Sequence, residues 1–333
     1  MDVLSQVLQQ VRLAGAVLFR AELGAPWCIS TRPGTVLAQK LGRPTMHVIT
    51  FHVVLQGRMW ARLGATDGQW VEAGQAVVLP HGDAHVLGDT PQGRPVPTSE
   101  LWGEVPLAQL RDVRWGGGGG RTRVLCGFLG CQRDAFAPLF AALPSLFRVQ
   151  LQQDDAAPAL DPLLAYAEHE IVSSRAGSAE LRLRMAELIF VEALRRYMEG
   201  MPEAGFGWLA GLRDPLVGRA LVLLHDAPQR AWDVETLAHE TASSRSHLAE
   251  RFKQVLGEPP MQYLSRWRML LATRRLRESR DSIAAVAEAV GYESPAAFQR
   301  AFKRHLGVTP ARWRCGDDVD TVGEAVHWRP RPW

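Results

Sequence analysis

The first 131 residues of the chain carry histidines and cysteines that could bind a metal ion, exchange protons or react with an oxidant. His52 lies in an apolar run, and His81 and His85 follow in a short turn. Cys126 and Cys131 lie together in a second apolar run. Imidazole titrates near neutral pH and is a common metal ligand, whereas a thiolate is a nucleophile and a target of oxidants. These side chains predict a site for a small-molecule or redox signal.

The same residues also have an ordinary structural interpretation. Free cysteine is most often a small buried hydrophobe, whereas a redox-sensitive thiol needs a lowered pKa and exposure. No CxxC pair occurs among the four cysteines, which argues against a structural zinc site. Both interpretations of Cys126 and Cys131 stay open, and no metal and no cofactor is predicted. No signal peptide or membrane span is visible, so a cytoplasmic protein with reduced thiols is expected.

Short apolar runs separated by turn residues predict the domain that positions these side chains. Between about residues 17 and 130, runs such as Val48–Leu55 and Ala76–Leu79 alternate with glycine-containing turns. Many short strands at such spacing are typical of an all-β barrel or sandwich. The run Gly116–Gly120 is expected to be a flexible loop ahead of a strand at Thr122–Leu129.

Two segments of this region resemble the motifs of the cupin barrel. Gly74 and the turn Pro80–His85 resemble the second motif, and His52–Gly57 resembles the end of the first. Metal-binding cupins also have an HxH pair and a glutamate, but here the pair is absent and Thr50 takes the glutamate position. The resemblance therefore implies a cupin fold that keeps only His85 of the ligand set. The alternative is an altered metal site built from His47, His52 and His81.

A duplicated, arginine-rich stretch lies near the C-terminus. Ser244–Pro260 superposes on Ser294–Pro310 at an offset of fifty positions. Each copy starts with a serine suited to a helix N-cap, continues with apolar residues at helical spacing, and ends at a glycine. A shorter amphipathic segment precedes each copy, so the pattern predicts two helix-turn-helix motifs. Two packed helical hairpins without a partner are the plainer alternative.

Positive charge is concentrated on this duplicated region. Residues 213–314 contain 17 basic and 11 acidic side chains, a net charge of +6, whereas the whole chain carries +3. Such a bias is what binding to DNA phosphates requires.

Residues of about 212 to 314 resemble the DNA-binding domain of the AraC/XylS family of bacterial transcription regulators. The segments that carry the resemblance are Trp232–Ala238, Gly291–Ser294, Phe298, Arg300–Arg304, Gly307 and Thr309–Pro310. Ala242 departs from the family, in which many members have glycine.

The resemblance implies a role for the second helix of each motif, which would enter the major groove of DNA. The predicted base-contacting residues are Ser246, Ala249, Glu250, Ala296, Gln299 and Arg300. The predicted phosphate-contacting residues are Arg245, Arg251, Lys253, Lys303 and Arg304.

Helical periodicity follows the β-rich region. Leu160–Ser173 and Ser178–Glu199 carry apolar stripes, including Leu181 and Leu188, that fit packing on the barrel, a dimer face, or both. The expected fold class is α+β multidomain, with a cupin-like β-barrel, a helical connector and an all-α C-terminal domain. The expected domains are 1–135 (sensor), 136–211 (connector), 212–314 (DNA-binding) and 315–333 (tail).

These patterns predict a transcription activator that binds operator DNA and RNA polymerase. Its signal would enter near His52, His81, His85 and Cys126. A cupin-type oxygenase or isomerase with a DNA-binding appendage is the alternative, against which the incomplete first motif argues. An architectural DNA binder without an effector is a third hypothesis, and the prediction is that the protein is not an enzyme.

Overall fold

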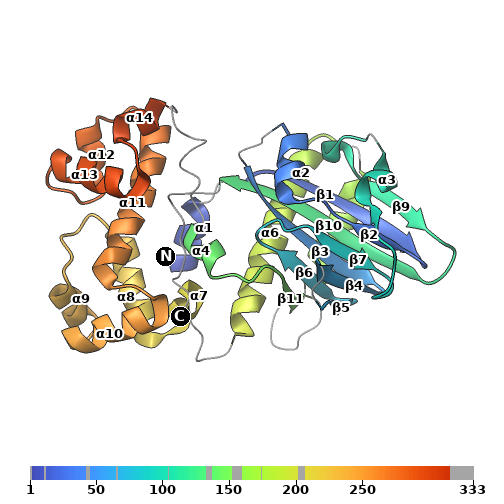
Figure 1. Cartoon of the computed structure of the whole chain (residues 1–333), viewed down its shortest axis with the longest axis horizontal. Helices are drawn as coiled ribbons and strands as arrows, with labels where there is room; N and C mark the ends of the chain where they lie inside the picture. The colour runs from blue at the N-terminus through green and yellow to red at the C-terminus, as the bar shows by residue number, and fades with distance from the viewer. Residues whose placement is uncertain are drawn as a thin grey trace. The chain divides into compact units, whose positions relative to one another are not determined.

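A computed structural model describes residues 2–10, 13–42, 46–64, 67–103, 105–132, 137–151, 160–173, 175–201 and 207–315. The chain divides into two compact units (Figure 1). One unit contains residues 13–132 and 143–200, and the other contains residues 1–12, 133–142 and 201–333. The predicted tail, residues 315–333, lies outside the described residues except for Cys315. Among the described helices, none is both long and apolar enough to cross a membrane.

The first unit is built on two packed β-sheets. The six-stranded sheet has the order β11-β6-β3-β10-β1-β9 and the five-stranded sheet has the order β5-β4-β7-β2-β8. The strands are β1 (Leu13–Gly24), β2 (Cys28–Ser30), β3 (Met46–Gln56), β4 (Arg58–Leu63), β5 (Gln69–Glu72), β6 (Gln75–Leu79), β7 (His85–Gly88), β8 (Val96–Pro97), β9 (Asp112–Gly116), β10 (Arg121–Gln132) and β11 (Phe147–Gln150). The predicted β-rich cupin-like domain is confirmed.

One apolar core fills the space between the sheets. Phe19 and Phe128 of the six-stranded sheet pack into the same cluster as Ile29, Met59 and Leu87 of the five-stranded sheet. Burying side chains of this size stabilises the folded state by about 1.5–3 kcal/mol each. The unit also contains the short helices α2 (Gly34–Lys40), α3 (Thr98–Trp102) and the 3-10 helix η1 (Leu107–Gln109).

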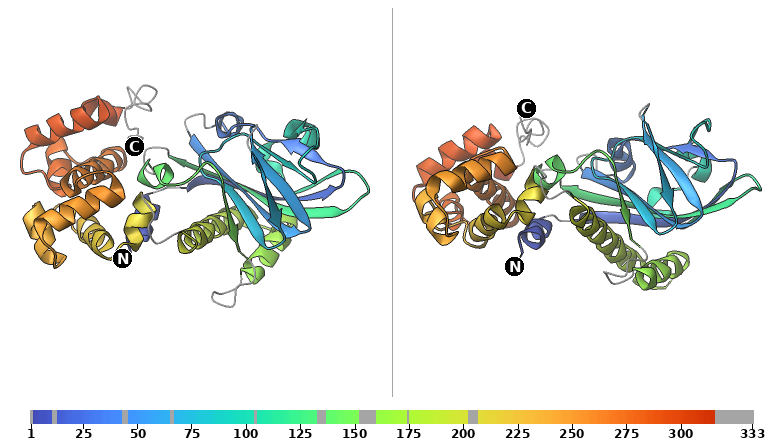
Figure 2. Two further views of the ribbon diagram at one scale, coloured as in Figure 1. Left: turned by 60° about the horizontal axis from the view of Figure 1, so that its bottom comes forward. Right: turned by 90° about the horizontal axis from the view of Figure 1, so that it is seen from below.

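Two helices of the predicted connector belong to this β-rich unit. They are α5 (Asp161–Val172) and α6 (Ser178–Glu199), which run along the six-stranded sheet and contact β1 (Figure 2). The apolar stripe of α6 divides in two, because Ile189 is buried while Leu181 and Leu188 are 39% and 55% exposed. Packing on the sheet therefore accounts for only part of the stripe.

The glycine run after β9 differs from the flexible loop that was predicted. The backbone N–H of Gly117 donates to Gly24 O at 2.7 Å, and that of Gly119 donates to Ala25 O at 2.9 Å. A Cβ atom at Gly116 would lie 2.2 Å from Gly24 O, and one at Gly117 would lie 2.6 Å from Ala25 O. The glycines allow two backbone segments to touch, and they form an exposed turn held by backbone hydrogen bonds.

The second unit is helical and contains the duplicated motifs. Its helices are α7 (Trp208–Arg213), α8 (Pro215–Asp226), α9 (Val234–Glu240), α10 (Arg245–Leu256), α11 (Pro260–Glu278), α12 (Ile283–Ala289), α13 (Pro295–Leu306) and α14 (Pro310–Cys315). Two segments from the N-terminal half join them: α1 (Val3–Gln10) packs on α8 and α4 (Ala137–Ala141) packs on α7. The boundary predicted at residue 211 falls inside α7, whose Trp208 is fully buried.

Each helix-turn-helix has the caps that the sequence predicts. The N–H of His247 donates to Ser244 Oγ at 3.2 Å, and that of Ala297 donates to Ser294 Oγ at 3.4 Å. Gly257 ends α10 in the left-handed conformation with φ 78°, and Gly307 does the same for α13 with φ 76°. Both motifs of the duplication are confirmed as capped helix pairs.

The two turns differ by one residue. Ala242 has φ 53°, and Gly291 has φ 84° at the matching step of the second motif. The N–H of Ala242 donates to His239 O and that of Ser243 to Ala238 O, the pattern that Gly291 and its successor repeat on α12. The first helices therefore align at an offset of 49, and the second turn is one residue longer.

We expect Ala242→Gly to raise the free energy of unfolding of this unit by about 0.5–1 kcal/mol. A left-handed backbone costs a non-glycine residue about 1–2 kcal/mol, and the extra freedom of glycine in the unfolded chain offsets about 0.4–1 kcal/mol of that gain. Urea denaturation measures the change.

Gly291→Ala is the mirror control and should destabilise the unit by more than about 1 kcal/mol. Alanine at this position would have a strained left-handed backbone, and its Cβ would lie 2.8 Å from Gln229 Cα. Lower stability in Ala242→Gly would show that the first turn is not strained.

Candidate functional site

The outward faces of α10 and α13 form the candidate DNA interface. On α10, Leu248 and Phe252 are fully buried, while Ser246 and Glu250 are exposed and Ala249 is half-buried. The helix thus packs one face on the unit and turns the other to solvent, as a helix that enters a groove must.

The second motif repeats this arrangement on α13. Phe298 and Phe302 are fully buried, whereas Ala296, Gln299 and Arg300 are exposed. All six residues predicted to contact bases therefore lie on the outward faces of the two helices.

The five predicted phosphate contacts fall into different environments. Lys253, Lys303 and Arg304 are exposed, and none of them has an ion-pair partner within the described chain. Arg245 lies 3.3 Å from Glu235, and both side chains are about 70% exposed, so solvent screens this pair. The side chains of these four cations are exposed to solvent.

Arg251 instead pairs with a buried carboxylate. Its guanidinium contacts Asp214 Oδ2 through Nε at 2.8 Å and through the terminal nitrogen at 2.7 Å. The Asp214 carboxylate is 7% exposed and also accepts from the N–H groups of Leu216 and Val217 at the start of α8. These backbone bonds and the bound guanidinium keep the pKa of Asp214 below its usual value despite burial.

A polar cluster inside the helical unit was not predicted. The Trp208 indole N–H donates to Tyr263 Oη at 2.9 Å, and His225 Nε2 lies 2.7 Å from the same oxygen. His225 also stacks on Trp267 with 4.0 Å between ring centroids. Helices α7, α8 and α11 supply these residues, whose separation in sequence gives no local signal of their contact.

The β-rich unit buries a continuous hydrogen-bonded chain between its sheets. His52 Nδ1 lies 3.1 Å from Cys126 Sγ, and His52 Nε2 lies 2.8 Å from His85 Nε2. His85 Nδ1 reaches Thr31 Oγ1 at 2.8 Å and Asp83 O at 2.9 Å. Strand β10 supplies Cys126 and strand β3 of the same sheet supplies His52, whereas β7 of the other sheet supplies His85. The chain therefore crosses the core.

The partners of this chain determine where its protons lie. Asp83 O can only accept, so His85 Nδ1 carries a hydrogen and a neutral His85 accepts at Nε2. His52 must then donate from Nε2 and accept at Nδ1, which leaves the thiol of Cys126 as the donor at the end. Every group of this chain is satisfied in its neutral form.

Burial keeps these groups neutral near pH 7. It lowers the pKa of His85 to about 4, and it lowers the pKa of His52 well below its usual value, with a smaller contribution from neighbouring His85. Burial also raises the pKa of the Cys126 and Cys131 thiols. In this conformation both cysteines are buried thiols, which is the environment of an inert cysteine.

His81 does not join this chain, although it was predicted beside His52 and His85. Its Nε2 lies 3.0 Å from Leu143 O. His47 Nε2 lies 2.6 Å from Pro80 O. Within the described ranges, no group of three histidine, cysteine or acidic residues could hold a metal ion.

Thr50 was predicted at the position of the missing glutamate, and it points to the same side of β3 as His52 because side chains alternate along a strand. It is 1% exposed, and its hydroxyl has no hydrogen-bond partner within the described chain. The Thr50 hydroxyl is therefore an unsatisfied polar group in the core, beside the satisfied chain.

Comparison with protein families identifies both units. Residues 2–199 match the cupin family, and residues 237–315 match a helix-turn-helix domain family.

Similar proteins include an AraC-like transcription regulator of Streptomyces lividans, which is 34% identical over 80% of this chain and 86% of its own length. The transcriptional regulator AlkR of Acinetobacter baylyi is 26% identical over 94% of this chain and 99% of its own length. The solved DNA-binding domain of AdpA in complex with target DNA is 34% identical over 32% of this chain and 96% of that domain, with a TM-score of 0.30.

We expect the two buried histidines to make the free energy of unfolding fall steeply between pH 6.5 and about 4. The unfolded chain binds protons there that the folded protein excludes, since the pKa of His85 is about 4 when folded. Each such histidine changes the free energy of unfolding by about 1.4 kcal/mol per pH unit.

The measurement is urea denaturation at several pH values, for the wild type and for His52→Gln/His85→Gln. Each protein gives a slope of unfolding free energy against pH. The difference between the two slopes reports on His52 and His85 alone, because the buried His225 is present in both proteins. Equal slopes in both proteins would contradict a neutral, buried pair.

Proposed function

Because the chain belongs to the AraC-like transcription regulators with an N-terminal cupin domain, which bind double-stranded DNA, we propose that its cupin unit reports a signal to α10 and α13 on an operator. The observation that carries this proposal is the pair of capped helices with polar outward faces and buried inward faces. Two helices reaching successive major grooves would sit about 34 Å apart.

Base recognition is assigned to the exposed positions near the start of each helix. Arg300 would donate to guanine O6 and N7, and Gln299 would pair with adenine N6 and N7. On α10, Glu250 would accept from cytosine N4, while Ser246 and the small Ala249 allow close approach. Ala296 plays the same permissive part on α13.

Phosphate contacts are assigned to Arg245, Lys253, Lys303 and Arg304, which position the protein without specifying sequence. Arg251 is removed from this set, because phosphate would have to displace a buried carboxylate that also caps α8.

A homodimer would use the exposed apolar side chains of the two cupin-unit helices. These are Tyr166 and Val172 on α5 and Leu181 and Leu188 on α6, exposed by 39–55%. The protein would act in the cytoplasm, where it binds the promoter beside RNA polymerase as an activator.

We assign no catalytic role to the cupin unit. The related proteins are described as transcription regulators, and the satisfied, neutral chain of Cys126, His52 and His85 holds its protons between fixed partners. A catalytic cupin would instead show metal retained after purification and turnover of a substrate.

The effector site is placed at the buried chain and at Thr50 beside it. A ligand that hydrogen-bonds the Thr50 hydroxyl would change the packing between the two sheets. An oxidant would do the same by converting the Cys126 thiol to a sulfenic acid in a conformation that opens the sheets and exposes the thiol. A difference of only about 1–3 kcal/mol between the free energies with which the effector binds the two conformations is enough for regulation. His81 lies outside this chain and contacts Leu143 O.

Arg300→Ala should weaken binding to the operator by about 1–3 kcal/mol and relax the preference at one base pair. Lys303→Ala should weaken binding to all sequences alike. It should also reduce the salt slope, which is the slope of the logarithm of the binding constant against the logarithm of salt concentration, by about one. Titrations of operator and random DNA at several salt concentrations separate the two effects. Equal losses on both DNAs for Arg300→Ala would remove it from base reading.

Arg251→Ala should act on stability. The substitution removes two charge-assisted contacts from the buried Asp214 carboxylate. We expect this loss to lower the free energy of unfolding by about 1–2 kcal/mol. The salt slope of DNA binding should stay at the wild-type value, and a reduced slope would return Arg251 to the phosphate contacts.

The sensor assignment predicts that Cys126→Ala and His85→Ala keep basal operator affinity and that at least one of them loses the response. The response is measured as operator binding with and without an inducer found by thermal-shift screening of metabolites and oxidants. Cys131→Ala is the matched control, since this thiol is equally buried on β10. Full response in both test variants would place the sensor elsewhere.

A further inference from the structure

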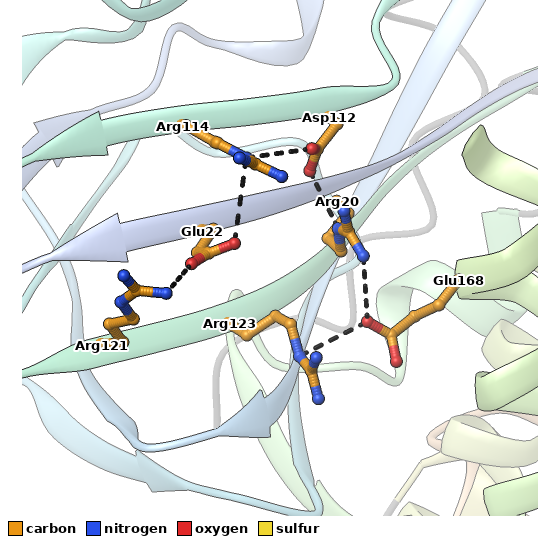
Figure 3. Close-up of polar contacts among 7 residues, drawn as sticks. All are labelled: Arg20, Glu22, Asp112, Arg114, Arg121, Arg123 and Glu168. Carbon is orange, nitrogen blue, oxygen red and sulfur yellow. Dashed lines mark hydrogen bonds and ion pairs between the residues drawn. The ribbon is translucent and has the colours of Figure 1, made fainter.

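A cluster of seven charged side chains joins the six-stranded sheet to α5 (Figure 3). Arg20 and Glu22 lie on β1, Asp112 and Arg114 on β9, Arg121 and Arg123 on β10, and Glu168 on α5. The paired registers of β1 with β9 and β10 bring these residues to one face of the sheet. The cluster is separate from the buried chain of His52, His85 and Cys126.

The contacts within the cluster run from the sheet toward the helix. Arg20 Nε donates to Asp112 Oδ1 at 2.9 Å, and Glu168 Oε1 lies 3.4 Å from Arg123 and 3.9 Å from Arg20. Asp112 also accepts from Arg114 Nε at 3.2 Å. The hydrogen bond from Arg20 is the main cause that keeps the pKa of Asp112 below its usual value, so this anchor stays ionised.

At the other end, two arginines converge on one carboxylate. Arg121 donates to Glu22 Oε1 at 2.9 Å, and Arg114 Nε lies 3.9 Å from Glu22 Oε2. The side chains of Arg114 and Arg121 are 70% and 75% exposed, whereas that of Glu22 is 26% exposed. Solvent therefore reaches the guanidinium groups more readily than the carboxylate they share.

A cavity of about 320 Å³ opens beside this pair. It is lined by Glu22, Gly24, Arg114, Trp115, Arg121 and the turn 116–119. The turn is held by its hydrogen bonds to Gly24 and Ala25, and no atom lies within 4 Å of a Cβ built at Gly118. The volume suits a small metabolite, and Trp115 supplies an aromatic wall.

We propose that this cavity binds the phosphate group of a small molecule, held by Arg114 and Arg121 in place of Glu22. The guanidinium fork matches phosphate oxygens. The seven side chains of the cluster are four arginines and three carboxylates, which leaves one positive charge over. A carboxylate ligand would carry the same charge as Glu22, whereas a phosphate monoester carries about −1.5 to −2 and can displace it.

The rest of the cluster positions the site. Asp112 accepts from Arg114 Nε, the same nitrogen that lies 3.9 Å from Glu22, and Arg20 donates to Asp112. Arg20 and Arg123 in turn contact Glu168, so occupation of the cavity would be felt at α5, which carries the exposed Tyr166 and Val172. This inference does not depend on the proposed effector site between the sheets.

The test is isothermal titration of the full-length protein with phenyl phosphate, inorganic phosphate and benzoate at constant ionic strength. We expect phenyl phosphate to bind and benzoate to bind at least about tenfold more weakly. If inorganic phosphate binds as tightly as phenyl phosphate, the ligand is free phosphate. If phenyl phosphate binds more tightly than inorganic phosphate, the ligand is a phosphate monoester. Both results support a phosphate site, and equal binding of benzoate would overturn it.

Three variants locate the bound phosphate. Arg121→Gln should weaken binding about tenfold or more, because a charge-assisted bond is lost. Glu22→Gln should strengthen binding about three- to tenfold by removing the competing charge, an outcome that a simple ion-pair network does not produce. Arg195→Gln, an exposed arginine paired with Glu192 on α6, is the matched control.

Phosphate can also bind the basic helical unit, but that binding would not change in the cavity variants. Unchanged affinity in both Arg121→Gln and Glu22→Gln would therefore overturn the proposal. Glu22→Gln keeps the test decisive if Arg121→Gln folds poorly, because a gain in affinity requires a folded site.

Discussion

Helix α11 must bury apolar side chains against both helix-turn-helix motifs at once, and the DNA-binding unit depends on this constraint. Its first half buries Tyr263 and Trp267, and Tyr263 meets Trp208 and Phe252. Its second half buries Met269 and packs with Phe298 and Phe302. Nineteen residues of helix span about 28 Å, which is close to one turn of DNA. One helix therefore contacts both motifs.

The cupin unit solves a different problem, which is how to keep polar groups in an apolar core. A buried polar group without a partner costs about 1–3 kcal/mol, and the chain from Cys126 through His52 and His85 to Thr31 avoids this cost by crossing from one sheet to the other. Each member is satisfied only while the two sheets keep their spacing. A change at any one member is thus a change in sheet packing, which makes the chain suitable for reporting a signal.

The sequence alone determined the elements with strong local signals. Serine caps, apolar residues at helical spacing and terminal glycines predict α10 and α13 within a residue, because these signals act over one or two turns. The short alternating runs predict the β-rich unit for the same reason. The family resemblance adds the function and the outward positions such as Arg300, since both motifs keep the family pattern apart from Ala242.

Only the tertiary structure decided which distant side chains meet. Arg251 resembles its exposed neighbours in sequence, yet it pairs with the buried Asp214, 37 positions away. His81 is four residues from His85 but points to Leu143, while Cys126 reaches His52 across 74 positions. The glycine run reads as a flexible loop until its contacts with Gly24 and Ala25 are known. Strand pairing and helix packing set these contacts, and no local pattern encodes them.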